Sequence, residues 1–336
     1  MNYSITENSR QTTYSGVDLI KFICSFLVVA IHIHPLSSFS PTLDYGIINY
    51  VARLAVPFFL TSSGYFVFRK TELNDFSFEP SLHFVKKILR LYGTWILILF
   101  VGEIWHLWYM EAAVVAVLLV SVLRSKKISV KYIVLISAIL YIIGLLGDSY
   151  YGLIEPLNRI HPVHLLFSAY RTLFGSTKNG VFMGMIFVSI GMLFAYVPIK
   201  MKEKYAVGGF IISMILLLGE VWMLKYFDMP KESNMYVFLV PAVFFLFYIA
   251  THIKLKNEEF CSALRVLSIL MFYSHMFVYC FIDHTIGFAL NTGMPSAIDN
   301  SLVRYCSTVL LTLALSYAIY KLSQTKRFNW LKWIYS

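Results

Sequence analysis

Charged residues are scarce in this chain. Only 14% of its 336 residues are Asp, Glu, Lys or Arg, whereas 58% are hydrophobic and 17% are aromatic. A soluble domain of this size needs a more polar surface, and the apolar runs here are long enough to cross a bilayer. The composition excludes a soluble globular protein. It predicts an all-α polytopic membrane protein with one membrane domain and no separate soluble catalytic domain.

Acidic residues are rarer than basic ones, with 18 Asp and Glu against 28 Lys and Arg and a net charge of +10. In a soluble protein such a balance would suggest nucleic acid. No basic cluster interleaved with exposed aromatics is present, however, and most of the basic residues lie between apolar runs. We therefore expect them to anchor the topology and to attract anionic lipid head groups, with no nucleic-acid partner.

Cysteine is also sparse, and the common catalytic motifs are missing. The four cysteines show no CxxC or metal-ligand spacing and are interpreted as small core residues (Cys24, Cys261, Cys280, Cys306). No GxSxG, Walker loop, dinucleotide fingerprint or HExxH occurs. His161 and His164 have a spacing that suits a metal, but no third ligand is identifiable. No metal site is predicted.

Ten apolar runs are separated by polar segments. The expected spans cover residues 15–34, 46–68, 88–103, 107–123, 129–147, 179–198, 206–225, 235–252, 263–283 and 301–321. With the N-terminus inside, most basic segments fall on one side, so the positive-inside rule places both termini in the cytoplasm. Residues 1–14 are predicted to be a cytoplasmic tail, 15–322 the ten-helix membrane domain, and 323–336 a basic and aromatic cytoplasmic tail.

The first span carries a polar stripe. Lys21 and His32 are eleven residues apart, about three helical turns, so they project from nearly the same face and lie roughly 16 Å apart along the axis. Asp18 and Ser25 fall close to the same line. Because ionisable groups inside a membrane normally face a protein interior or a watery cavity, this stripe is the leading candidate for a functional site.

Further ionisable residues lie in or near other spans. Arg53 lies about two turns inside the second span, while Lys87 and Arg90 precede or begin the third and suit either topology or an anion site. His32 and His275 suit interhelical hydrogen bonds or function equally well. Together with Glu220, near the outer end of the seventh span, these imidazoles would form an acid–base constellation. The sequence alone does not bring them together.

These residues resemble a known family. Lys21-x10-His32 is similar to the Arg/Lys-x10-His signature of the acyltransferase 3 family of integral membrane acyltransferases. Further stretches resemble its later motifs in the expected order, namely residues 53–59 with 63–65, Lys87-x-x-Arg90, 106–109, 177–180 and 267–275. Within this family, the sequences of these motifs look most similar to the membrane half of VanT-type serine racemases and to stand-alone Gram-positive relatives. The racemase half and an extracytoplasmic SGNH domain are not expected here.

The resemblance implies a ten-helix bacterial plasma-membrane protein that uses acyl-CoA, usually acetyl-CoA, as a cytoplasmic donor. Lys21, Arg53, Lys87 and Arg90 would bind this donor substrate, and no tightly bound cofactor is implied. His32, His275 and Glu220 would form the catalytic set, with His32 as general base or nucleophile. We expect O-acylation, most economically O-acetylation, of an extracytoplasmic saccharide or lipid-linked hydroxyl in the cell envelope.

Transport is the competing interpretation. VanT-type membrane domains have been associated with supplying L-serine, and a bundle with buried Lys21, Arg53, His32 and His275 suits a small zwitterion. Against this, no inverted repeat and no matched pair of Gly- or Pro-broken spans is evident. The acyltransferase interpretation is therefore preferred.

Overall fold

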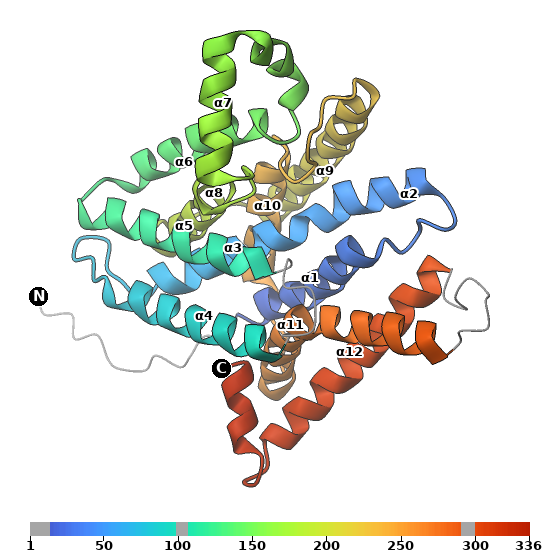
Figure 1. Cartoon of the computed structure of the whole chain (residues 1–336). Coiled ribbons are helices and arrows are strands. Elements are labelled where there is room, and N and C mark those ends of the chain that lie inside the picture. The colour runs from blue at the N-terminus through green and yellow to red at the C-terminus, as the bar shows by residue number, and fades with distance from the viewer. Residues whose placement is uncertain (1–13, 99–106, 290–299) are drawn as a thin grey trace, which may run out of the picture.

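The computed structural model describes residues 14–98, 107–289 and 300–336, and within these ranges every regular element is a helix (Figure 1). The α-helices are α1 (Ser15–Ile33), α2 (Pro41–Gly46), α3 (Ala55–Phe68), α4 (Glu79–Ile98), α5 (Trp108–Ser125), α6 (Val130–Leu146), α7 (His161–Phe174), α8 (Met185–Tyr196), α9 (Glu203–Tyr226), α10 (Leu239–His252), α11 (Glu258–Ala289) and α12 (Ser301–Ser323). Short π or 3₁₀ turns are η1 (Ile47–Val51), η2 (Ala52–Leu54), η4 (Tyr151–Leu153), η5 (Glu155–Arg159), η6 (Gly180–Gly184) and η7 (Asn329–Ile334). The all-α prediction is confirmed for this part of the chain.

Seven helices in the described ranges are long and apolar enough to cross a membrane. They are Ser15–Ile33, Pro41–Phe68, Trp108–Ser125, Val130–Gly147, Glu203–Tyr226, Glu258–Ile282 and Ser301–Ser323. Two shorter apolar helices, Gly180–Tyr196 and Leu239–His252, correspond to the sixth and eighth predicted spans. The predicted third span begins within α4, whose first half is polar. The count of ten spans and the cytoplasmic position of both termini stay predictions.

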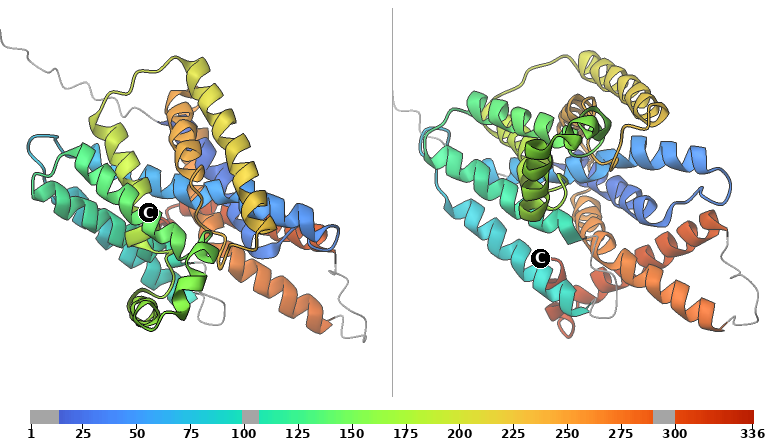
Figure 2. Two further views of the ribbon diagram at one scale, coloured as in Figure 1. Left: turned by 90° about the horizontal axis from the view of Figure 1, so that it is seen from above. Right: turned by 45° about the horizontal axis from the view of Figure 1, so that its top comes forward.

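The predicted polar connection at residues 148–178 contains a helix that the span pattern does not reveal. α7 stands apart from the other helices at one edge of the bundle (Figures 1 and 2). Its second residue is Pro162, which a first helical turn tolerates because the missing amide has no partner there. A short amphipathic helix lacks the long apolar run by which spans are recognised. Residues 1–13, 99–106 and 290–299, which include His106 and the end of the predicted third span, lie outside the described residues.

The second span is one continuous helical stretch with an irregular centre. α2 passes into the π turn η1, then the 3₁₀ turn η2, and then α3, so Arg53 lies on the tightest turn. Pro57 follows in the first turns of α3. η6 is a second π turn, and it starts where the Asn179 side chain accepts hydrogen bonds from the amides of Val181 and Phe182. Such departures from α geometry occur often at functional sites.

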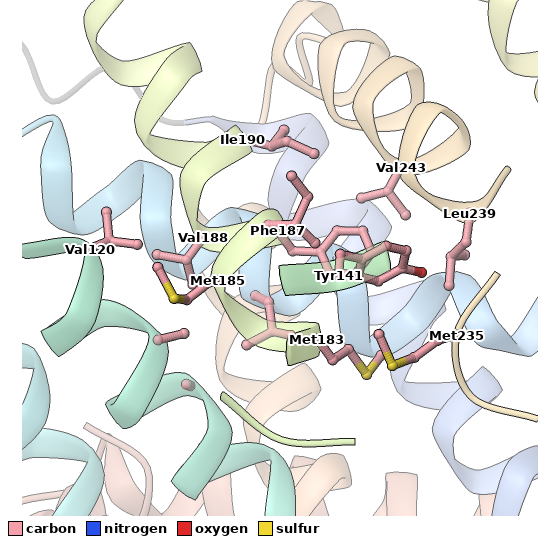
Figure 3. Packing of buried hydrophobic residues seen from close by; sticks show 14 of the residues in the cluster. Val120, Tyr141, Met183, Met185, Phe187, Val188, Ile190, Met235, Leu239 and Val243 are labelled. Atoms are coloured by element: carbon pink, nitrogen blue, oxygen red, sulfur yellow. The ribbon is translucent and has the colours of Figure 1, made fainter. Parts of the chain in front are cut away.

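Small residues let the central helices approach closely. α3 packs on α8, and a Cβ added at Gly64 would collide with the backbone of Val188, while one at Gly191 would collide with the carbonyl of Thr61. Helices in membranes commonly pack through small residues in this way. Beside this crossing lies a buried apolar cluster that includes Tyr141, Met183 and Phe187 (Figure 3). α3 is thereby held firmly behind the candidate site.

A second packing layer forms where α1 lies against α11, and α11 in turn packs on α12. Figure 1 shows α11 and α12 as neighbouring helices on the side of α1 that is away from α7. This arrangement brings the polar stripe of the first span against the ninth predicted span. The two histidines of the candidate site come from these two helices.

Candidate functional site

α1 and α11 bring the two predicted imidazoles together. The ring centroids of His32 and His275 are 5.3 Å apart, with the ring planes inclined by 37°. His275 is fully buried, and its Nδ1 lies 2.8 Å from the carbonyl oxygen of Phe272. Since a carbonyl accepts only, Nδ1 of His275 carries the proton in this contact and Nε2 is the acceptor nitrogen of the neutral ring. The sequence raised His32 and His275 as a candidate pair, and the structure places their rings side by side.

His32 faces a cavity of about 220 Å³, which we call the histidine cavity. Its polar and aromatic lining comprises His32, Arg53, Trp108, Tyr109, Lys178, Asn234 and Phe272. These side chains come from α1, η2, α5, the turn before η6, the segment before α10, and α11. Arg53, predicted to bind the donor, thus lies beside His32 and not with Lys21.

Neutral amides hold the guanidinium of Arg53. Its Nη1 donates to Oδ1 of Asn234 at 3.0 Å, and its Nη2 donates to Oδ1 of Asn49 at 2.9 Å. The Asn234 amide nitrogen donates in turn to the carboxylates of Asp148 at 3.0 Å and Glu232 at 2.9 Å. Two carboxylates therefore orient Asn234, and Asn234 orients Arg53.

Lys178 adds a second cation to this cavity. Its Nζ lies 5.1 Å from the ring centroid of Trp108, a cation–π distance. Burial lowers the pKa of Lys178; Glu232 opposes this effect, and the positive charge of Arg53 adds to it. The two cations are close enough to repel each other, and the nearby carboxylates of Glu232 and Asp148 offset part of their charge.

Lys21 opens onto a different cavity of about 250 Å³, which we call the lysine cavity. Its charged and polar lining comprises Lys21, Ser63, Lys87, Arg265 and Ser268. The guanidinium of Arg265 forms a two-point ion pair with Asp18, at 2.7 Å between Nη2 and Oδ2 and at 3.1 Å between Nε and Oδ1. One carboxylate balances three cations, so this cavity is also suited to an anion.

The two cavities share a wall. Tyr109 and Phe272 line both of them, and Phe59 packs on this pair from the lysine cavity. The ring centroids are 5.4 Å apart for Tyr109 and Phe272, 5.9 Å for Phe59 and Tyr109, and 6.0 Å for Phe59 and Phe272. We call these three rings the aromatic partition. The hydroxyls of Tyr109 and Ser63 are 3.3 Å apart across its edge.

Arg90 and Glu220 lie elsewhere. Arg90 donates to the backbone carbonyl of Ser336 and stacks on Trp333, with its Cζ 5.0 Å from the ring centroid, so the C-terminal segment occupies it. Glu220 accepts hydrogen bonds from the Tyr150 hydroxyl at 2.7 Å and from the amides at positions 237 and 238 at 2.6 and 3.0 Å. These contacts tie α9 to the start of α10. The structure does not bring Glu220 to the two imidazoles.

Several lining residues were not predicted as site residues. They are Tyr109, Lys178, Asn234, Arg265 and Phe272. From the sequence, Arg265 looked like a topology anchor. The only sequence feature that pointed to a site role for Arg265 was the opposite charge of Asp18 in the first span. Aromatic residues are too frequent here for two of them to be singled out. In the described ranges, no three His, Cys, Asp or Glu side chains gather as metal ligands.

Comparison with known proteins bears on this site directly. Residues 14–105 match the acyltransferase domain family Acyl_transf_3. The resemblance to the acyltransferase 3 family is confirmed. The matched acyltransferase segment contains Lys21, His32, Arg53, Lys87 and Arg90, which are five of the seven predicted site residues. His275 and Glu220 lie beyond it.

Curated relatives of the chain come from enterococci. An "Amino-acid racemase" of Enterococcus faecalis is 32% identical over 337 residues, covering 93% of this chain and 45% of the relative. A "Serine/alanine racemase" of Enterococcus gallinarum is 30% identical over 328 residues, covering 89% of this chain and 45% of the relative. The chain thus spans less than half the length of these relatives. No solved structure matches the chain.

Proposed function

We propose that the protein is a membrane O-acyltransferase. In this proposal it moves an acyl group, most economically acetyl, from cytoplasmic acyl-CoA to a hydroxyl of an extracytoplasmic cell-envelope saccharide or lipid-linked acceptor. The observation that carries the proposal is the pair of cavities that meet at the aromatic partition. One presents three cations, and the other presents the imidazole of His32, against which the buried ring of His275 packs. The acyltransferase match to residues 14–105 supports the reaction class.

The lysine cavity suits the donor. In the predicted orientation it lies on the cytoplasmic side, where Lys21, Lys87 and Arg265 would hold the phosphates of CoA. The thioester arm would then reach past the aromatic partition toward His32. The axial rise from Lys21 to His32 is about 16 Å, which is comparable to the length of an extended pantetheine arm. Arg90 would contribute to donor binding only after its contact with the C-terminal segment opens.

The histidine cavity suits the transfer step. His32 would take the proton of the acceptor hydroxyl while the hydroxyl oxygen attacks the thioester carbonyl carbon. The new C–O bond forms as the C–S bond breaks, and CoA leaves as a thiolate that takes up the proton from the imidazolium of His32. The hydrogen bond from Nδ1 of His275 to a backbone carbonyl would keep the His275 ring in a fixed position beside His32. The partition would keep water from reaching the thioester from the donor side.

The proposal is tested with the full chain in lipid vesicles. Acetyl-CoA is supplied on the cytoplasmic face, saccharide acceptors are supplied on the other face, and both CoA release and acylated product are measured. We expect acceptor-dependent release of CoA that matches product one to one. Failure to bind or consume acetyl-CoA would refute the acyltransferase proposal.

Lys87 provides a specific test of the donor site. Replacing Lys87 with Gln removes one cation from the lysine cavity, and we expect the KM for acetyl-CoA to rise about tenfold, since a hydrogen bond to a charged group contributes roughly 1.5–3 kcal/mol. The adjacent Lys86 is exposed and does not line the cavity, so Lys86→Gln is the matched control. Equal KM values for the two variants would exclude Lys87 from donor binding.

Amino-acid transport is the second candidate, since one relative is named for serine and alanine, which are small zwitterions of the kind that such a transporter would carry. Two cavities separated by one layer of rings also suit alternating access to a small zwitterion such as L-serine. Uptake of labelled L-serine into vesicles without acyl-CoA would support transport. Uptake that depends on neither His32 nor Arg53 would argue against this site.

A further inference from the structure

Arg53, in the histidine cavity, is held in place by neutral amides and not by a direct ion pair. Arg53 bonds to the amide oxygens of Asn49 and Asn234, and within the described residues no carboxylate forms an ion pair with its guanidinium. Its Nε is buried and has no hydrogen-bond partner among them. Neutral dipoles can orient a charge but cannot cancel it. The guanidinium is therefore pre-organised and still able to bind an anion.

The surrounding carboxylates are arranged to keep this charge available. Asp148 and Glu232 lie behind Asn234 and accept from its amide nitrogen, which leaves its amide oxygen for Arg53. Glu232 also accepts from the Ser176 hydroxyl at 2.9 Å. Had either carboxylate bonded to Arg53 directly, the cavity would hold a closed ion pair. The interposed amide separates the charges.

Lys178, in the turn before η6, adds a second cation that also lacks a direct ion pair. It lines the cavity over Trp108, and no carboxylate in the described part of the chain lies within ion-pair distance of it. Two cations and one imidazole thus face one small space. That space, about 220 Å³, lies below the usual range of roughly 300–1,000 Å³ for ligand pockets, so only the reacting head of an acceptor fits.

We infer that the acceptor carries an anionic group, a phosphate or a carboxylate, close to the hydroxyl that is acylated. Arg53 and Lys178 bind the anion, and His32 meets the hydroxyl. This inference rests on the proposed acyl transfer and specifies its substrate class. It also places Arg53 in acceptor recognition, whereas the sequence pointed to donor binding.

The kinetic test compares small hydroxyl acceptors with and without an anionic group. The full chain in phosphatidylcholine vesicles receives acetyl-CoA with glycerol, glycerol 3-phosphate or glycerate, and a parallel sample contains phosphatidylglycerol as a lipid-borne phosphate. We expect kcat/KM at least tenfold higher for the anionic acceptors than for glycerol. Acylation of phosphatidylglycerol alone identifies a lipid headgroup as the source, whereas acylation of the free compounds identifies a soluble or saccharide anion. Equal use of glycerol overturns the inference.

Variants identify the residues involved. Asn49→Asp places a carboxylate on the Arg53 guanidinium, and Lys178→Gln removes the second cation; each is expected to reduce the anionic preference to threefold or less with an unchanged KM for acetyl-CoA. Lys231→Gln is the control, because Lys231 is an exposed cation on the same predicted side but does not line the cavity. Retention of the full preference in both test variants would overturn the assignment.

A binding measurement separates this inference from the proposed reaction. Trp108 lines the cavity, so its fluorescence reports on an anion beside Lys178, with Trp108→Phe giving the background. We expect saturable quenching by inorganic phosphate that Asn49→Asp abolishes. Binding without any CoA release would leave the anion site intact and refute acyl transfer. CoA release with neutral acceptors, in the absence of phosphate binding, would support acyl transfer and refute the anion site.

Discussion

Replacing His32 with Gln is expected to reduce acetyl-CoA-dependent acyl transfer by about 10²- to 10⁴-fold, the usual contribution of a positioned general base. Gln keeps a polar side chain of similar reach but cannot take a proton at neutral pH. The fold should survive, because His32 faces a cavity and is not fully buried. The measurement is CoA release from vesicles, together with the thermal unfolding midpoint of the purified variant.

The matched control is His34→Gln. His34 follows α1, is about half exposed, and pairs with Asp44 at 2.7 Å, away from both cavities. We expect its activity to stay within a factor of about two of wild type, since surface substitutions usually have small effects. Full activity in the His32 variant would remove the imidazole from the mechanism. An equal loss in both variants would indicate damage to the end of α1 instead.

Gly191→Leu is expected to prevent assembly of the membrane bundle. A side chain at this position collides with the backbone of α3 at Thr61 and Tyr65, and backbone cannot move aside as a flexible side chain can. Overpacking by a few methylene groups costs about 1–3 kcal/mol where neighbours can adjust, and a rigid helix crossing should cost at least the upper value. We expect little folded monodisperse protein in detergent, measured by size-exclusion chromatography.

Gly208→Leu provides the comparison. Gly208 lies in α9, and an added Cβ there meets no atom within 4 Å. The same substitution should therefore leave the elution profile and the unfolding midpoint close to wild type. If Gly191→Leu also behaved as wild type, the tight crossing of α3 and α8 would be incorrect, and with it the support behind the histidine cavity.

The sequence predicted the helices well because apolar runs and polar breaks are local properties. α1 and α12 begin at the first residue expected for their spans, and Lys21 and His32 lie on the helix that was predicted to hold them. The pairing of His32 with His275 was raised as a possibility from their similar depth in the membrane. Depth along the bundle axis can be counted in residues, so such pairs can be anticipated.

Which side chains of different helices face each other around the bundle axis could not be predicted in the same way. Arg53 and Lys21 are both cations in early spans, and only the rotation and packing of their helices place them in different cavities. Glu220 looked like an acid beside the imidazoles, but its carboxylate caps the start of α10. Nothing in a sequence states which face of one helix meets which face of another. The three rings of the aromatic partition come from three helices and share no local signal.

In the proposed orientation, the aromatic partition would also determine where most of the membrane voltage falls. If water filled the lysine cavity from one side and the histidine cavity from the other, the insulating path would shrink from the ~30 Å hydrocarbon layer to one layer of rings. A charge crossing that layer meets nearly the full potential, about 2.3 kcal/mol per 100 mV. An acetyl thioester is neutral, and the CoA phosphates stay with the cations of the lysine cavity. The proposed acyl transfer across this layer of rings would therefore depend little on the membrane potential, whereas carriage of an ion would depend on it strongly.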